Sequence, residues 1–302
     1  STLTRSATRT AAAGMAAASR VAPRLLSRAL SGSPVVQVER PSVQEYVMGQ
    51  SPQHSNAGAD MSPDEALALL QEGNRMHQEG DMEGLLLDRI GPQLTPKRRE
   101  ELLSGQSPLA TVLTCADSRV SPEIMFGAGL GTVFVVRNAG NIVSTEALAS
   151  LEFGCIVLKT PLLVVMGHQG CAAVANTVIS VQEAGLARAN EVLQLGGSAA
   201  DMSVGPDTLP KYVHDVVGRI TPAAVDAIQG AAKDATTDDV VEDAIIRNAD
   251  LSLRRILHMS SAISDKLRQQ PGKGFKAVTA KYSQTTGGVT FFPQLPELSE
   301  FR

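Results

Sequence analysis

Short apolar runs alternate with amphipathic segments through the middle of this 302-residue chain. The runs near 109–114, 132–138 and 161–166 are rich in β-branched and other apolar residues, which is typical of strands buried inside a parallel sheet. The segments between and after them carry apolar residues at helical spacing. This alternation predicts an α/β fold, in which a central, mostly parallel β-sheet is flanked by helices.

Helix boundaries are marked by capping signals. Residues 62–65, Ser-Pro-Asp-Glu, place Ser as N-cap, Pro at the first helical position and Glu at the third, so a helix is predicted from here to Gly80. A loop and a short helix near 98–103 should follow, and Gly287-Gly288 indicates a hairpin turn near the C-terminal end. The other segments expected to be helical are a turn at 122–126 and helices at 144–159, 171–187, 212–230 and 239–270. A surface loop is expected at 196–210.

The glycine-rich segment at 127–131, Gly-Ala-Gly-Leu-Gly, suggests a dinucleotide-binding loop at first sight. It does not match G-x-G-x-x-G, because Thr132 stands where the third glycine is required. The glycines also precede a predicted strand, whereas the nucleotide motif follows one and opens a helix. We therefore predict a tight turn here.

Composition narrows the class of protein. Hydrophobic residues make up 43% of the chain and charged residues 19%, which suits a globular domain with a sizeable core. No apolar run reaches the roughly 18 residues of a membrane span. The net charge of −4 gives no argument for nucleic-acid binding. Three cysteines do not resemble a disulfide framework, so reduced thiols in an intracellular compartment are expected.

Residues 1–38 differ in composition from the rest. They are rich in Ala and Ser, contain no acidic residue before Glu39, and carry arginines at 5, 9, 20, 24 and 28. This composition is typical of an organelle transit peptide, and a disordered basic tail is the alternative. Residues 39–58 are predicted to be a linker or arm. The folded domain is expected at 59–302.

Metal-capable side chains directly follow two of the apolar runs. Cys115, Asp117 and Arg119 follow the first run, whereas His168 and Cys171 follow the third. Sites in open α/β sheets form at the carboxyl ends of strands, so two neighbouring strands would bring two thiolates and one imidazole together. A Cys2His set leaves a fourth metal position open, which distinguishes catalytic zinc sites from closed structural ones.

Each of these residue types also has an ordinary structural role. A lone buried cysteine is usually a small hydrophobe, and we expect this for Cys155, which lies among apolar neighbours. The histidines at 54, 77, 214 and 258 are expected to be surface or hydrogen-bonded residues without a metal. H-x-x-C and C-x-D-x-R are each weak signals, but their joint occurrence after two apolar strands is much more specific.

The chain resembles the β-carbonic anhydrases. Four short motifs carry the resemblance: CADSR at 115–119, FVVRNAGN at 134–141, SLEF at 150–153 and GHQGC at 167–171. It extends over about 60–293, including the first predicted helix and the terminal hairpin. The resemblance implies the β-carbonic-anhydrase fold with an N-terminal helical arm. The activity it implies is zinc-dependent, reversible hydration of CO2 to bicarbonate and a proton.

The resemblance also implies the metal ligands and a catalytic pair. One Zn²⁺ per chain would be held by Cys115, His168 and Cys171. Asp117 and Arg119 would be catalytic: Arg119 holds Asp117 away from the metal in the active form, and in a closed form Asp117 can itself ligate zinc. In the active form water or hydroxide would occupy the fourth position on the metal.

Further implied residues bind the substrate. Gln106 matches the family's substrate-binding glutamine, and Phe134 and Phe153 match its apolar pocket positions, although many members carry Tyr where Phe153 stands. The family usually has Gly after the second cysteine ligand, whereas Ala172 follows Cys171 here. The implied assembly is a homodimer or higher homo-oligomer, in which Gln106 reaches the neighbouring subunit's site.

Two other functions remain open on the sequence alone. One is a structural or interaction subunit that keeps this fold inside a larger organellar complex. The other is hydrolysis of carbonyl sulfide or carbon disulfide at the same site. The N-terminal composition favours the mitochondrial matrix, with a plastid as the alternative.

Overall fold

The computed structural model describes residues 58, 60–194, 210–269 and 274–292. At its centre is a five-stranded sheet with the strand order β2-β1-β3-β4-β5. The strands span Ala110–Cys115 (β1), Val133–Asn138 (β2), Leu162–His168 (β3), Lys276–Tyr282 (β4) and Val289–Phe292 (β5).

Strand pairing makes the sheet mostly parallel. β1 pairs in parallel with both β2 and β3, β3 pairs in parallel with β4, and only β5 is antiparallel to its neighbour. All residues of β1 and β3 are buried, as expected for strands covered on both faces. The predicted fold class and the terminal hairpin are confirmed. Because β1 and β3 are parallel neighbours, their carboxyl ends lie at the same edge of the sheet.

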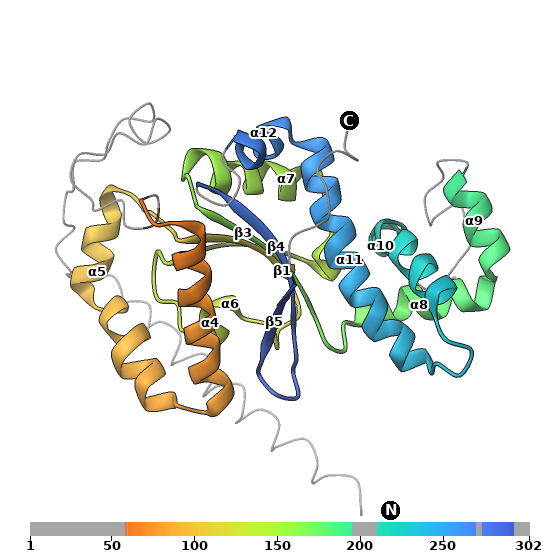
Figure 1. Ribbon diagram of the computed structural model, residues 1–302, viewed down its shortest axis with the longest axis horizontal. Helices are drawn as coiled ribbons and strands as arrows, with labels where there is room; N and C mark the ends of the chain where they lie inside the picture. Colours follow the sequence, from red (N-terminus) through yellow and green to blue (C-terminus); the bar gives the residue numbers. More distant parts are fainter. Residues whose placement is uncertain (1–57, 59, 195–209, 270–273, 293–302) are drawn as a thin grey trace, which may run out of the picture. The chain divides into compact units, whose positions relative to one another are not determined.

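Helices cover both faces of the sheet (Figure 1). Side chains of α4 and α6 pack on one face against β1, β3 and β4. Those of α7, α11 and α12 pack on the other face, and α8 and α10 form a third cluster with α11 beside the carboxyl end of β1. The helix bounds are Pro63–Glu79 (α4), Pro96–Glu101 (α5), Pro122–Met125 (α6), Thr145–Glu152 (α7), Ala172–Ala184 (α8), Leu186–Gln194 (α9), Lys211–Gly230 (α10), Thr237–Met259 (α11) and Ser261–Gln269 (α12).

The first predicted helix is confirmed, with its capping. The Ser62 side chain accepts a hydrogen bond from the Glu65 backbone N–H, and the Glu65 carboxylate accepts one from the Ser62 N–H. Gly80 ends the helix in the left-handed conformation, with φ of 71°. Segment 127–131 is a turn before β2, as predicted, and Gly127 and Gly131 both have positive φ.

Other helix boundaries were predicted wrongly. The helix expected at 239–270 is interrupted at Ser260, whose extended backbone separates α11 from α12 and whose hydroxyl accepts from the Ile263 N–H as a new N-cap. The helix expected at 144–159 leaves α-geometry after Glu152 and continues as a π-helical segment, η5 (Phe153–Val157). The helix expected at 171–187 is divided by Gly185, which has positive φ.

The stretch after Gly80 is also more helical than predicted. In place of a loop it contains a π-helical segment, η1 (Gly84–Ile90), and a short 3-10 turn, η2 (Gly91–Gln93). Two further 3-10 turns are η3 (Leu102–Ser104) and η4 (Ala139–Asn141).

The predicted transit peptide at 1–38 lies outside the described residues. The linker at 39–58 does too, apart from its last residue, and so does the loop at 196–210 up to residue 209. Among the residues that are described, no helix is both long and apolar enough to cross a membrane.

Candidate metal centre

Cys115, His168 and Cys171 meet at the carboxyl edge of the sheet. Cys115 is the last residue of β1, His168 is the last residue of β3, and Cys171 is the N-cap of α8. All three are buried, and one ligand atom from each lies within 4.8 Å of the others. The parallel pairing of β1 with β3 therefore produces the arrangement that the two sequence motifs predicted.

The imidazole of His168 has one nitrogen with a partner and one without. Nδ1 lies 2.9 Å from the carbonyl oxygen of Gln169. Nε2 is buried and has no hydrogen-bond partner among the residues that the structure describes. Because a carbonyl can only accept, Nδ1 carries the proton in this hydrogen bond and Nε2 presents a lone pair. A buried lone pair without a donor is what a metal ligand requires.

The spacing of the two thiols also fits zinc. The sulfurs of Cys115 and Cys171 lie 4.0 Å apart. Two thiolates bound to one tetrahedral zinc, each at about 2.3 Å, would be separated by ~3.8 Å. Two sulfurs and one imidazole nitrogen are ligands that Zn²⁺ prefers, so the residues present fit this metal.

The two thiols differ in acidity. The hydrogen bond donated by the Cys171 thiol lowers the pKa of Cys115, and the Gly140 backbone N–H, 3.4 Å from the Cys115 sulfur, also favours the thiolate. The same pairing raises the pKa of Cys171. Burial raises the pKa of Cys155 to about 11, so this thiol is neutral and inert. Cys155 is completely buried within η5, as its predicted role as a small hydrophobe requires.

Asp117 and Arg119 form a bidentate ion pair beside the three ligands. Arg119 Nε donates to Asp117 Oδ1 at 2.9 Å, and its Nη2 donates to Oδ2 at 2.7 Å. These hydrogen bonds hold the pKa of Asp117 well below its usual range. Asp117 Oδ2 is 4.0 Å from His168 Nε2, so the carboxylate lies at the edge of the metal group. In this structure Arg119 therefore holds the Asp117 carboxylate through two hydrogen bonds. Ligation of zinc by Asp117 stays a prediction.

The loops around the centre are fixed by polar residues that the sequence analysis missed. Arg137, on β2, donates to the carbonyls of Cys115 and Asp117 at 3.1 and 2.7 Å. From α11, Asn248 donates to the Gly140 carbonyl at 2.8 Å and Ser252 donates to the Asn141 carbonyl at 2.9 Å. Arg137 lies within the family motif at 134–141 and could have been found there, whereas the α11 residues belong to no motif.

The expected substrate residues lie away from the metal group of the same chain. Phe134 pairs with Thr111, four residues before Cys115 along β1, which corresponds to roughly 13 Å. The Phe134 and Phe153 rings are 6.1 Å apart, centroid to centroid, so these two residues do lie together. Gln106 lies before the amino end of β1, whereas Cys115 is at its carboxyl end.

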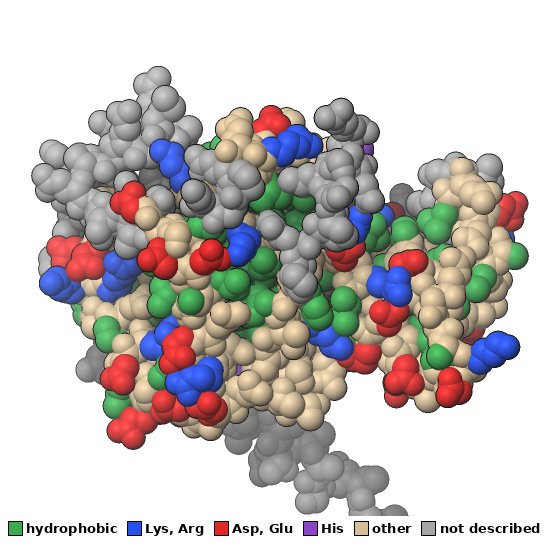
Figure 2. All heavy atoms as spheres, viewed as in Figure 1, with side chains coloured by type: hydrophobic (Ala, Val, Ile, Leu, Met, Phe, Trp, Pro, Cys, Tyr) green, Lys and Arg blue, Asp and Glu red, His purple; other side chains and the backbone are tan. Residues whose placement is uncertain are grey.

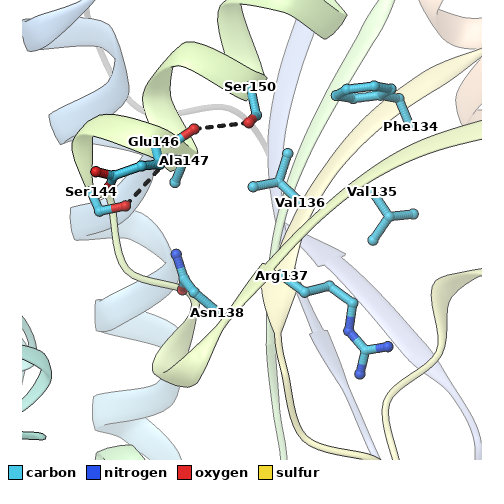
Figure 3. A pocket seen from close by; sticks show the side chains of 9 residues that line it. All are labelled: Phe134, Val135, Val136, Arg137, Asn138, Ser144, Glu146, Ala147 and Ser150. Carbon is cyan, nitrogen blue, oxygen red and sulfur yellow. Dashed lines mark hydrogen bonds between the residues drawn. The ribbon is translucent and has the colours of Figure 1, made fainter.

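A pocket of about 350 Å³ lies between β2 and α7, and Phe134 is part of its lining (Figure 3). The pocket extends along β2 to Arg137 and Asn138, near the metal group, and its opposite wall is formed by Ser144, Glu146, Ala147 and Ser150. β2 is the edge strand of the sheet, since it pairs only with β1 among the described strands. Unlike β1 and β3, it has no fully buried residue.

Ala172, which replaces the family's usual glycine, opens α8. Its side chain is exposed, and the residue after it, Ala173, is partly buried. The added methyl is therefore accommodated at the helix start without being buried.

Comparison with known proteins assigns the class of this chain. The family model described as carbonic anhydrase matches residues 110–289, more than half of the chain. Carbonic anhydrase 2 of Mycobacterium tuberculosis is 33% identical over 207 residues, covering 68% of this chain and 83% of the relative. A shorter match, 39% identical over 80 residues, covers 24% of this chain and 28% of Beta carbonic anhydrase 6, mitochondrial, of Arabidopsis thaliana.

Solved structures agree on the fold. The β-carbonic anhydrase CafA of Aspergillus fumigatus superimposes with a TM-score of 0.53 at 18% identity, covering 79% of this chain and 98% of that one. A tetrameric β-carbonic anhydrase of Sordaria macrospora gives a TM-score of 0.50 at 19% identity, covering 76% of this chain and 93% of that one. At these identities the likeness concerns the fold alone.

The chain belongs to the β-class carbonic anhydrase family, as the sequence motifs predicted. It is a carbonate dehydratase, and the family's metal, zinc, is its cofactor. CO2 and bicarbonate are therefore its substrates.

Proposed function

We propose that this protein interconverts CO2 and bicarbonate at a zinc centre held by Cys115, His168 and Cys171. The observation that carries the proposal is the buried, unpartnered Nε2 of His168 facing two thiols. When bound there, zinc supplies the Lewis acidity that makes water nucleophilic near neutral pH. The alternatives of a structural subunit and of carbonyl sulfide or carbon disulfide hydrolysis receive no support from the family match.

Two residues of this chain, Asp117 and Arg119, orient the reacting water and its proton at that centre. Asp117 Oδ2 lies close enough to the metal group to accept a hydrogen bond from the reacting water. This hydrogen bond orients a lone pair of the water toward CO2. Arg119 keeps the carboxylate ionised and fixed through two parallel hydrogen bonds. Since the pKa of Asp117 lies well below its usual range, Asp117 remains an acceptor throughout the neutral and mildly acidic range.

The function is tested directly by stopped-flow CO2 hydration with the zinc-loaded protein. We expect turnover that disappears on zinc removal and returns on zinc addition. A zinc-loaded, folded protein without CO2 hydration would contradict the proposal, and the same preparation examined for co-purifying proteins would test the organellar-complex alternative.

The proposed working unit is a homodimer in which Gln106, Phe134 and Phe153 of one subunit serve the metal centre of the other. Within one chain, the segment that contains Gln106 precedes Ala110, and the strand from Ala110 to Cys115 rises about 17 Å. A two-fold axis at the edge strand β2 would bring the amino-end residues of one subunit to the carboxyl edge of the other. The pocket beside Phe134 opens at this same edge of the sheet.

Subunit exchange tests the shared site. Inactive Gln106→Ala protein is mixed with inactive Cys115→Ser protein, so that one site in each mixed dimer has an intact metal ligand set and a glutamine. We expect activity to return to about one quarter of the wild-type value, because random exchange makes half of the dimers mixed. Proven mixed dimers with no recovered CO2 hydration would place Gln106 in its own subunit's site or outside catalysis.

We further propose that residues 1–38 direct the chain to the mitochondrial matrix, with residues 39–58 as a linker to the domain at 59–302. The support is compositional: five arginines precede the first acidic residue, Glu39. A fusion of residues 1–40 to a fluorescent protein should enter mitochondria, and the same fusion with the five arginines before Glu39 changed to Gln is the control. Plastid import would establish the alternative, and diffuse fluorescence of the unaltered fusion would contradict both.

A further inference from the structure

The turn between β4 and β5, residues 283–288, lies directly against the loop that carries two of the metal-group residues. The side-chain oxygen Oε1 of Gln169, between His168 and Cys171, accepts three hydrogen bonds from this turn. The donors are Ser283 Oγ at 3.1 Å, the Thr285 N–H at 3.1 Å and Thr285 Oγ1 at 3.0 Å. The Gln169 N–H also donates to the Tyr282 carbonyl at 2.8 Å. The β4–β5 turn and the loop around Gln169 are therefore fastened together.

The same turn is anchored from the other side by α4. The buried side chain of Asn74 donates to the Gly287 carbonyl at 2.8 Å and accepts from the Val289 N–H at 2.7 Å. Two independent sets of hydrogen bonds thus fix the backbone of the turn. A side chain that projects from this turn therefore starts from a rigid backbone. A residue that supports a metal centre requires such a backbone.

That side chain is Gln284, whose terminal amide reaches His168. Gln284 Nε2 lies 3.1 Å from His168 Nδ1. The same His168 nitrogen lies 2.9 Å from the Gln169 carbonyl oxygen. The Gln169 carbonyl requires a proton on Nδ1, and an N–H group of Gln284 cannot then donate to the same atom. A half-turn of the amide exchanges its oxygen and nitrogen without moving its neighbours, and the oxygen then accepts the Nδ1 proton.

We propose that Gln284 is a positioning residue for the zinc centre: its amide oxygen and the Gln169 carbonyl share the Nδ1 proton of His168. This fixes the imidazole ring and keeps Nε2 unprotonated toward Cys115 and Cys171. The inference rests on the proposed zinc centre. An amide suits this place because it adds no charge beside two thiolates, whereas a carboxylate would add one.

Partners of this kind contribute about 10- to 100-fold to metal affinity in zinc proteins. We therefore expect Gln284→Met, which keeps the length of the side chain but cannot accept strongly, to weaken zinc binding by roughly 10-fold or more. Gln284→Glu can only accept, so it should retain the wild-type tautomer and restore most of the affinity. Thr286→Ala is the matched control, because Thr286 is an exposed residue of the same turn whose hydroxyl accepts from the Gly288 N–H, away from His168 and Gln169.

The experiment measures two quantities in the wild type and the three variants. Zinc affinity is measured by competition with a chromophoric chelator. The protonated nitrogen of His168 in the metal-free protein is identified by ¹⁵N NMR of the imidazole. We expect the wild type, Gln284→Glu and Thr286→Ala to bind zinc tightly with the proton on Nδ1, and Gln284→Met to bind it weakly with a mixture of tautomers.

Failure of this inference is distinguishable from failure of the proposed zinc centre. A folded wild-type protein that takes up no zinc would remove the centre itself. Unchanged affinity and tautomer in Gln284→Met would overturn the role of Gln284 while leaving the centre intact. Equal weakening by Gln284→Met and Thr286→Ala would overturn it as well, since the turn as a whole, and not the Gln284 amide, would then support His168.

Discussion

Replacing Cys115 by Ser should abolish zinc binding and CO2 hydration together. The serine hydroxyl is neutral near pH 7, so the metal loses one of its two thiolate ligands and half of the negative charge that balances it. Changing residues that only support a ligand already costs 10- to 100-fold in metal affinity, so loss of a ligand should cost more than roughly 100-fold. Zinc content by elemental analysis and stopped-flow turnover on the same sample measure both effects.

Cys155→Ser is the matched control for this experiment. Cys155 is also buried, but its thiol is neutral and it lies in η5, away from the metal group. This variant should retain a full complement of zinc and most of its activity. Full zinc occupancy in Cys115→Ser, or equal loss of zinc in both variants, would show that Cys115 is not a ligand.

The metal group could be predicted from the sequence because local patterns determine it. Each ligand lies within or just after a strand rich in apolar, β-branched residues. In parallel sheets, binding and catalytic residues lie at the carboxyl ends of the strands. Two strand ends and one N-cap thus suffice to bring Cys115, His168 and Cys171 together. Only the neighbour relation of β1 and β3 had to be assumed, and the parallel pairing of these strands confirms it.

The supporting contacts could not be predicted in this way, because they join residues far apart in the chain. Asn248 of α11 reaches the Gly140 carbonyl, and Asn74 of α4 reaches the turn before β5. Asn74 ends a stretch that resembles the family but was assigned no role, and Asn248 lies in no motif. Each is an ordinary polar position on an otherwise amphipathic helix. Which polar position becomes buried depends on the tertiary packing of the helix. The sequence pattern of that helix alone does not determine this position.

The errors in helix boundaries have a related cause. The apolar period continues through Ser260, so the pattern predicts one helix where the chain makes two. The Ser260 hydroxyl donates to Glu152 of α7 and accepts from the Ile263 N–H, and these contacts favour an N-cap over a continuous helix. A serine that caps a helix cannot be distinguished from a serine within a helix until its hydrogen-bond partners are known.

Asp117→Asn is expected to reduce CO2 hydration by at least roughly 100-fold while the fold and most of the zinc are retained. Asparagine has nearly the same shape as aspartate, but it carries no charge and one of its two oxygens is replaced by a donor. Arg119 would lose its bidentate partner, and the reacting water would lose the acceptor at Oδ2 that lies 4.0 Å from His168 Nε2. Since none of the three proposed zinc ligands is changed, metal content should stay near that of the wild type.

A second Asp–Arg pair provides the control for this substitution. Asp226 on α10 pairs with Arg247 on α11, and its side chain is 63% exposed, so Asp226→Asn makes the same chemical change away from the metal group. Exposed pairs of this kind contribute little to stability, and both turnover and zinc content should be unaffected. Near-normal turnover in Asp117→Asn would exclude a catalytic role for the Asp117–Arg119 pair. A loss of turnover explained entirely by a parallel loss of zinc would instead mean that Asp117 serves to retain the metal.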